Sequence, residues 1–196
     1  MPEPQRQPDD DARRIEARRD ALLVERVLAG DADAYGELVA RHMRRAFSIA
    51  WRILEHREDA EDVVQDAFIR ALEGMGTLDP TRSFGPWFHR IVVNGALNYR
   101  RRRSVRATQP MPGDVAATTS SPEADTENAL LRRRLRAALD TLPERQRTIV
   151  QLADLEGMNS SEIAVILDVP AGTVRWHLHQ ARQTLRAALG APEEAS

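Results

Sequence analysis

The chain has 196 residues, of which 30% are charged and 5% aromatic, and its formal net charge is −2. It contains no Cys, and all 28 of its basic residues are Arg. The lack of Cys excludes disulfides, thiol catalysis and Cys-based zinc sites, and the lack of Lys excludes the P-loop lysine and the lysine Schiff base. Because a strong stand-alone DNA binder is normally basic, the net charge argues against that class.

The composition favours an all-α fold, because Ala, Leu, Glu and Arg are abundant and β-branched runs are scarce. Residues 1–19 begin with a Pro-, Asp- and Arg-rich stretch that holds little apolar content, which predicts a disordered N-terminal tail. The first 20 residues lack the apolar segment of a signal peptide, and no apolar run approaches the length of a membrane span. We therefore expect a cytoplasmic protein that does not insert into a membrane.

Two helices are predicted between Asp20 and Leu54, separated at Gly30, with Asp31 or Asp33 as the N-cap of the second helix. His42 lies on the apolar stripe of the second helix, which is typical of a core histidine. Trp51 lies outside that stripe, so it either packs on a neighbouring helix or is exposed.

Residues 59–73 form the clearest amphipathic helix of the chain. Its apolar face follows a spacing of three and four residues and consists of Ala60, Val63, Val64, Ala67, Phe68, Ala71 and Leu72. The opposite face carries Asp59, Asp62, Gln65, Asp66 and Ile69. An acid row can bind a metal ion, but no His or second carboxylate helix completes such a site, so no metal is predicted. An Ile among acids favours a docking surface for a basic partner.

The helix predicted from Phe84 to Arg106 changes character along its length. It begins with aromatic and aliphatic residues and ends in an Arg run between Arg100 and Arg106. Rings beside guanidinium groups suit a nucleic acid whose bases are partly unstacked. The alternative is a core helix whose last turn is basic and solvated, as the helix dipole favours.

Residues 106–128 have the Pro-, Ser-, Thr- and Ala-rich composition of a flexible linker. Fully extended, about 23 residues could span ~75 Å, or about two turns of B-DNA. Two small helical domains are therefore predicted, over residues 20–105 and 129–189, with a short tail at 190–196. Their spacing would allow both to contact one duplex.

The second domain ends in a predicted helix-turn-helix. Asn159 caps a short helix with Glu162 in the capping-box position, and Ala171 to Leu189 form the long second helix. On this last helix the residues expected to face outward are Gly172, Arg175, Trp176, His179, Gln180 and Gln183, with Arg182 at the boundary. Arg175 suits guanine edges, while Trp176 either reads DNA or packs on a neighbouring helix.

These parts, in this order, resemble an extracytoplasmic-function (ECF) RNA polymerase sigma factor over about residues 20–189. The most specific marks are the run DAEDVVQDAF at residues 59–68, the series Trp87, Phe88, Ile91 and Asn94 before the Arg run, and the motif of Leu142, Pro143 and Arg147. The motifs EIA at residues 162–164 and GTVR at residues 172–175 complete them.

The resemblance implies core RNA polymerase and promoter DNA as partners, with no cofactor and no enzymatic activity, and a stress or envelope-response regulon. The polymerase clamp would bind Asp59, Asp62, Gln65, Asp66 and Ile69. The minus-ten element would contact Arg82, Ser83, Phe84, Trp87, Arg90, Asn94, Asn98 and Arg101. The minus-thirty-five element would contact Gly172, Thr173, Arg175, Trp176, His179 and Arg182. Members of this family are usually held inactive by an anti-sigma factor, often a membrane-bound one.

The sequence departs from the family at several reading positions. Trp176 stands where Ser is common, His177 and Gln180 where Arg is common, and Asn98 where Asp is common. The promoter sequence therefore does not follow from the resemblance. The alternative function is a stand-alone helix-turn-helix regulator with an N-terminal interaction domain, which would bind DNA tightly without polymerase. For an enzyme, His89 and Asp79 form the only nearby acid–base pair.

Overall fold

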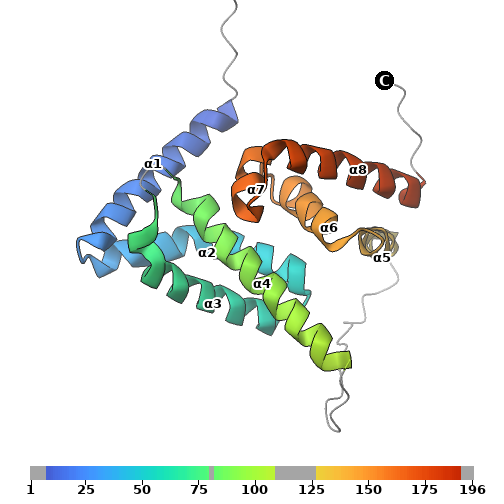
Figure 1. Cartoon of the computed structure of the whole chain (residues 1–196), viewed down its shortest axis with the longest axis horizontal. Coiled ribbons are helices and arrows are strands. Elements are labelled where there is room, and N and C mark those ends of the chain that lie inside the picture. The colour runs from blue at the N-terminus through green and yellow to red at the C-terminus, as the bar shows by residue number, and fades with distance from the viewer. Residues whose placement is uncertain (1–7, 80–81, 109–126, 191–196) are drawn as a thin grey trace, which may run out of the picture. The chain divides into compact units, whose positions relative to one another are not determined.

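The computed structural model describes residues 8–79, 82–108 and 127–190. All regular structure in these ranges is helical, which confirms the expected all-α class. The chain divides into two compact units, with the boundary between Arg100 and Arg101 (Figure 1). Within the described ranges, no helix has both the length and the apolar character needed to cross a membrane.

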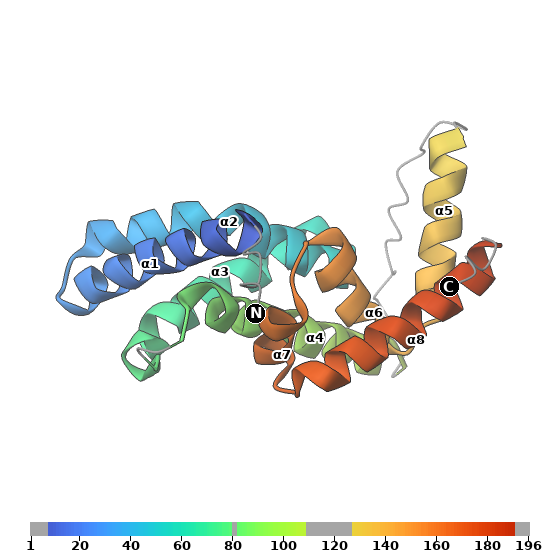
Figure 2. The ribbon, with the colours of Figure 1, turned by 90° about the horizontal axis from the view of Figure 1, so that it is seen from above.

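The first unit is built from helices that pack around α2. Its elements are α1 (Pro8–Leu28), α2 (Ala32–Leu54), α3 (Arg57–Gly74), the 3-10 turn η1 (Met75–Thr77) and α4 (Phe84–Thr108). Helices α1 and α2 lie side by side, as Figures 1 and 2 both show. Asp31 rather than Asp33 caps α2, because its side chain accepts hydrogen bonds from the backbone N–H groups of Asp33 and Ala34.

The prediction of a disordered tail over residues 1–19 is wrong from Pro8 onward, where α1 begins. The Asp20 side chain is only 5% exposed and holds α1 on α2 through Arg41 Nε, 3.0 Å from Oδ1, and His42 Nε2, 2.9 Å from Oδ2. Glu16 also pairs with Arg41. These partners lie more than 20 residues away in the sequence, so local composition gave no indication of them.

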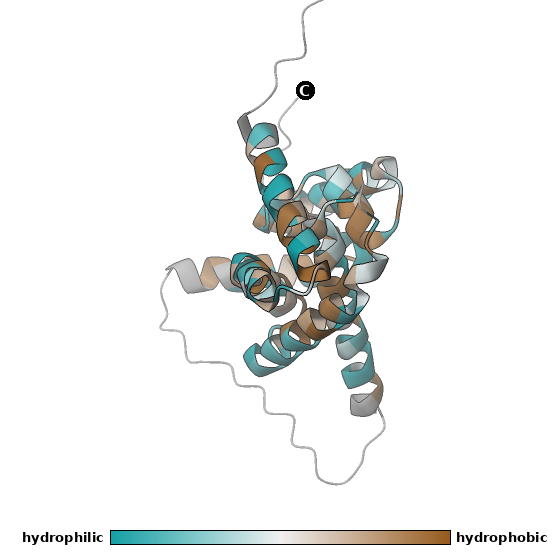
Figure 3. Cartoon of the chain, turned by 90° about the vertical axis from the view of Figure 1, so that its left-hand side faces the viewer, coloured by the Kyte–Doolittle hydropathy of each residue, from teal (hydrophilic) through white to brown (hydrophobic). Residues whose placement is uncertain are grey.

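The core of the first unit centres on three aromatic rings. Phe88 is 0% exposed and stacks on Phe68 of α3, with ring centroids 4.4 Å apart, and on Phe84, with centroids 5.6 Å apart. Helices α3 and α4 also approach closely at Gly95, where an added Cβ would lie 3.3 Å from Val63 Cγ1. Figure 3 shows apolar and hydrophilic residues on different faces of the helices. The apolar half of α4 is therefore a core element.

The second unit contains the helix-turn-helix. Its elements are α5 (Glu127–Asp140), α6 (Glu144–Val150), the π-helical segment η2 (Gln151–Leu155), α7 (Ser160–Leu167) and α8 (Ala171–Leu189). The core consists of Ala138, Leu142, Val150, Ala181 and Leu185. The predicted capping box of Asn159 and Glu162 is present, and α8 has its predicted bounds. Figure 2 shows α5 crossing α8, with which it packs.

The expected linker over residues 106–128 is helical at both ends, because α4 continues to Thr108 and α5 begins at Glu127. The rest of that segment, residues 109–126, lies outside the described residues, as do residues 1–7 and residues 191–196 of the expected C-terminal tail.

Candidate functional site

The polar side of α3 is exposed over most of its length. Asp62, Gln65 and Asp66 are exposed, and Ile69 is 52% exposed among them. We call these four residues the acidic surface. Asp66 has a distant pair with Arg70, at 4.0 Å. An exposed pair at this distance contributes little, so the carboxylates are available to a partner.

Asp59, grouped with this surface from the sequence, has a different environment. Its side chain is 13% exposed, and Oδ1 accepts a hydrogen bond of 2.6 Å from the Tyr99 hydroxyl of α4. His56 Nδ1 lies 3.5 Å from Oδ2. Asp59 therefore joins α3 to α4. Leu72, expected on the buried face, is also different, because it is 48% exposed near the end of α3.

An exposed apolar stripe on α2 extends the surface that sequence analysis identified. Its residues follow a spacing of three and four and are Gly36, Ala40, Met43, Phe47, Trp51 and Leu54. Met43 is 41% exposed and Trp51 43%, which settles the two possibilities for Trp51 in favour of exposure. The same spacing is visible in the sequence, but a stripe on a helix that packs on both α1 and α3 was expected to be core.

The predicted minus-ten residues of α4 share one face of the helix. Trp87, Arg90, Asn94, Asn98 and Arg101 are spaced three or four residues apart, opposite the buried Phe88, Val92 and Ala96. Asn94, Asn98 and Arg101 are exposed, and Trp87 and Arg90 are half-buried. The structure thus brings these five predicted residues together. We call them the α4 face.

The remaining predicted minus-ten residues lie at the start of α4. Arg82 and Ser83 are exposed, and Arg82 Nε lies 3.7 Å from Asp79 Oδ2. Phe84 is only 2% exposed and stacks on Phe88, so its ring belongs to the core and not to the α4 face. The acid–base alternative lacks support, because His89 is 4% exposed while Asp79 pairs with Arg82 on the surface.

The Arg run of α4 combines both readings of the sequence. Arg100 Nη1 donates a hydrogen bond of 3.2 Å to the carbonyl oxygen of Ile53, which ties the run to the end of α2. Arg101, Arg102 and Arg103 are exposed beyond it. The run is therefore anchored on the first unit and presents positive charge to solvent.

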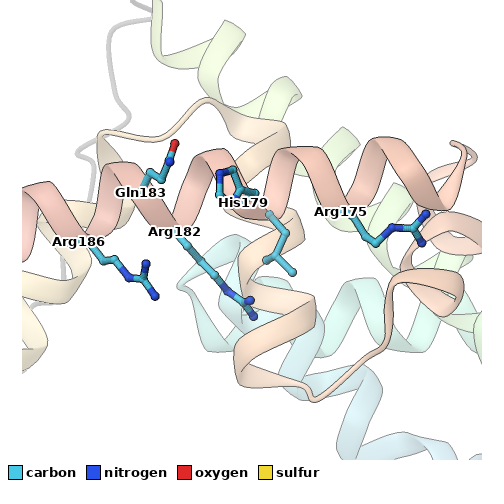
Figure 4. Close-up of a pocket in the computed structure, with 6 residues that line it drawn as sticks. Arg175, His179, Arg182, Gln183 and Arg186 are labelled. Atoms are coloured by element: carbon cyan, nitrogen blue, oxygen red, sulfur yellow. The ribbon is translucent and has the colours of Figure 1, made fainter. Parts of the chain in front are cut away.

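On α8 the expected division of faces is present. Val174 and Ala181 are 0% exposed, whereas Arg175, His179 and Arg182 are exposed and line a shallow depression with Leu178, Gln183 and Arg186 (Figure 4). Gly172 is exposed and Thr173 half-buried at the start of the helix. Trp176 is 57% exposed and meets only the edge of the neighbouring His177 ring among the described aromatic rings, which favours a surface role over packing.

Comparison with known proteins identifies both units. The sequence model of Sigma-70 region 2 matches residues 38–106, and that of Sigma-70, region 4 matches residues 132–185. The ECF RNA polymerase sigma-E factor of Escherichia coli (strain K12) is 35% identical over 176 residues, which cover 85% of this chain and 92% of that protein. The chain belongs to the ECF sigma factors.

Other relatives agree with this assignment. ECF RNA polymerase sigma factor SigE of Mycolicibacterium smegmatis is 38% identical over 156 residues, which cover 78% of this chain and 60% of the relative's length. The solved structure of CnrH in complex with the cytosolic domain of CnrY is similar with a TM-score of 0.67 and 28% identity. That similarity covers 89% of this chain and 99% of CnrH.

One acid lies directly beside the α8 surface of this sigma factor. Arg182 contacts Asp154 of η2 through two nitrogens, with Nε 3.3 Å from Oδ2 and Nη2 2.5 Å from Oδ1. The hydrogen bond to Asp154 raises the pKa of Arg182 further above its ordinary value. Sequence analysis missed Asp154, because its partner lies 28 residues away. The pair neutralises one of the arginines that could contact a phosphate.

We therefore predict that Asp154→Asn tightens binding of the polymerase-bound sigma factor to minus-thirty-five duplex, by roughly three-fold, because the carboxylate no longer competes with phosphate for Arg182. Fluorescence titration at several salt concentrations measures the change. The same substitution in an Arg182→Gln background should have a clearly smaller effect. Equal effects in both backgrounds would show that Asp154 acts through general repulsion and not through Arg182.

Proposed function

We propose that this sigma factor binds core RNA polymerase through the acidic surface, reads the minus-ten element with the α4 face and the residues before it, and reads the minus-thirty-five element with α8. The observation that carries the proposal is the separation of charge. A chain with net charge −2 exposes an acidic surface on α3 and basic faces at the end of α4 and on α8. One surface thus suits a basic protein, and two suit DNA.

Docking through α3 is supported by the exposure of its polar side. The packing of the first unit uses Val64, Ala67 and Ala71 of this helix and leaves Asp62, Asp66 and Ile69 unused. An apolar residue surrounded by acids is typical of a protein interface whose partner is basic. The exposed α2 stripe lies on a helix packed against α3, so it can widen this interface.

Minus-ten recognition is supported by the residue types of the α4 face. A base that leaves the duplex stack needs a ring to stack on and hydrogen-bonding groups for its edge, and Trp87, Asn94 and Asn98 supply both. Arg90 and Arg101 lie on the same side of the helix, where they can contact phosphates. The half-buried position of Trp87 holds its ring in place before DNA arrives.

Minus-thirty-five recognition is supported by the exposed side of α8. The N-terminal half of a recognition helix contacts base edges in the major groove, and Arg175 lies there with the flat Trp176 and with His179 one turn on. Arg175 suits a guanine edge, since a guanidinium group can donate to both O6 and N7. Arg182 and Arg186 lie further along the helix and suit phosphates.

Regulation by a second protein is part of the same proposal. CnrH, which resembles this chain, is solved in complex with the cytosolic domain of CnrY. A protein that covers the acidic surface or α8 would prevent binding of polymerase or DNA, so an anti-sigma factor is the expected regulator. We further infer that the chain works in the cytoplasm, where polymerase is found, on genes of a stress or envelope response.

The first prediction concerns docking. Asp62→Arg combined with Asp66→Arg should weaken binding to core polymerase by several kcal/mol, because like charges then meet across the interface. Helicity and melting temperature should change little, since both positions are exposed. Asp11→Arg with Glu25→Arg, exposed on α1, is the matched charge control. Unchanged affinity of the α3 variant in a titration with core polymerase would exclude this docking surface.

The second prediction separates a sigma factor from a stand-alone regulator. The free protein should bind promoter duplex weakly at physiological salt, because its net charge provides little long-range attraction. Addition of core polymerase should produce specific binding and transcription from promoters selected out of a random library. Nanomolar, sequence-specific binding by the isolated protein would instead favour a helix-turn-helix regulator.

The third prediction separates the two DNA-reading surfaces. Arg175→Ala should cost ~1 to 3 kcal/mol and relax preference at one or two minus-thirty-five positions, while strand opening survives. Asn94→Ala should instead reduce opening, measured as permanganate reactivity of promoter thymines. A template with a pre-opened bubble should rescue the Asn94 variant and leave the Arg175 defect unchanged. If the bubble affects both variants alike, the two surfaces do not have separate tasks.

A further inference from the structure

Asp20 of α1 is a buried carboxylate outside the region that matches the sigma family, which begins at residue 38. Its two oxygens have different partners on α2. Oδ1 accepts a hydrogen bond of 3.0 Å from Arg41 Nε, and Oδ2 lies 2.9 Å from His42 Nε2. Because a buried carboxylate accepts hydrogen bonds, the Nε2–H of His42 is the donor. The His42 ring is thus held by its polar edge.

The other side of the His42 ring contacts the start of α4. Its centroid lies 5.1 Å from that of Phe84, 6.0 Å from that of Phe88 and 5.8 Å from that of His89, all in edge-to-face geometry. The ring packs closely here, since a Cβ added at Gly85 would lie 3.5 Å from His42 Cε1. His42 is therefore the link between the Asp20 carboxylate and the aromatic rings of α4.

These rings fix both ends of the segment that leads into α4. Arg82 and Ser83 directly precede Phe84 in the chain. The Trp87 ring lies 5.7 Å from the Phe84 ring and reaches the end of α3, where a Cβ added at Gly74 would lie 3.7 Å from Trp87 Cζ2. A shift of Phe84 would therefore move the two exposed residues before it and the support of Trp87.

We propose that Asp20 is a positioning residue for minus-ten recognition, which it supports through His42 by holding the Phe84 ring and with it Arg82, Ser83 and Trp87. The inference rests on the proposed function, in which these residues and the α4 face read the minus-ten element. Asp20 does not touch DNA in this proposal. It determines whether the residues that do so are in the correct place before the bases leave the stack.

The surroundings of the linked pair support this role. Asp20 is 4% exposed and His89 is also 4% exposed, so little water competes for the hydrogen bond. Burial holds the pKa of His89 well below its ordinary value, which keeps that neighbouring ring neutral. A second contact between α1 and α2, Arg26 Nη1 to Glu37 Oε1 at 3.3 Å, is exposed and makes no contact with the aromatic rings. It provides the matched control.

The experiment uses full-length protein with core polymerase and a promoter selected from a random library by transcription. For each variant, transcription is compared between this promoter and promoters with single base changes in the minus-ten or minus-thirty-five element. The ratio of the two activities measures base discrimination and does not depend on the fraction of active protein. The variants are Asp20→Asn, which weakens the acceptor, His42→Phe, which retains a ring without the hydrogen bond, their double mutant, and Glu37→Gln as control.

Asp20→Asn and His42→Phe should each lower minus-ten discrimination, by roughly three- to ten-fold, and the double mutant should be no worse than the poorer single variant, because both remove one link. Discrimination at the minus-thirty-five element, affinity for core polymerase and the Glu37→Gln control should be unchanged. If Asp20→Asn fails to fold, His42→Phe decides alone.

Two results would overturn the inference. Unchanged minus-ten discrimination in variants that melt at lower temperature would mean that Asp20 only stabilises the fold. A parallel loss at both elements would mean a general defect. The proposed function fails in a different way, because the wild-type protein itself would then show no base preference at the minus-ten element, and the inference would fail with it.

Discussion

Helix α4 has to serve as a core element and as a DNA-binding surface, and the arrangement of the first unit follows from this constraint. Phe88 stacks between Phe68 and Phe84, which fixes the rotation of the helix about its axis. With that rotation fixed, residues three and four positions apart on the other side form the α4 face. Removal of the Phe88 ring would leave a cavity in the core and free the orientation of every residue on that face.

The distribution of charge explains how a chain with slight negative net charge can work on DNA. Long-range attraction to a duplex depends on net charge, whereas contacts at short range depend on local patches. The patches here are the Arg run of α4 and the outward side of α8, and one arginine of α8 is paired with Asp154. Such a protein discriminates weakly on its own and gains from a partner that brings it to the promoter.

Several elements could be predicted because their signals are local. The capping box of Asn159 and Glu162 and the buried stripe of α8 depend on residues within a few positions of one another, and both are present. The face shared by Asn94, Asn98 and Arg101 follows from helical spacing alone.

The features that could not be predicted depend on distant partners. Helix α1 was missed because Asp20 is held by Arg41 and His42. Asp59 looks like its acidic neighbours in the sequence, but Tyr99, 40 residues away, makes it a structural residue. Phe84 was grouped with the minus-ten residues, although the ring stack buries it. Whether an aromatic or an acid is exposed depends on which helix lies over it, and helical periodicity carries no information about that.

The same distant contacts make the docking helix and the reading helix one body. Tyr99 donates to Asp59 across α3 and α4, Gly95 allows these helices to approach at Val63, and Arg100 donates to the carbonyl of Ile53 at the end of α2. A partner bound on the acidic surface of α3 therefore rests on the helix whose opposite side holds α4. Since packed helices move together rather than deform continuously, polymerase that fixes α3 also fixes the orientation of Asn94 and Asn98. Docking and base recognition are then coupled within the first unit, without any change in its fold.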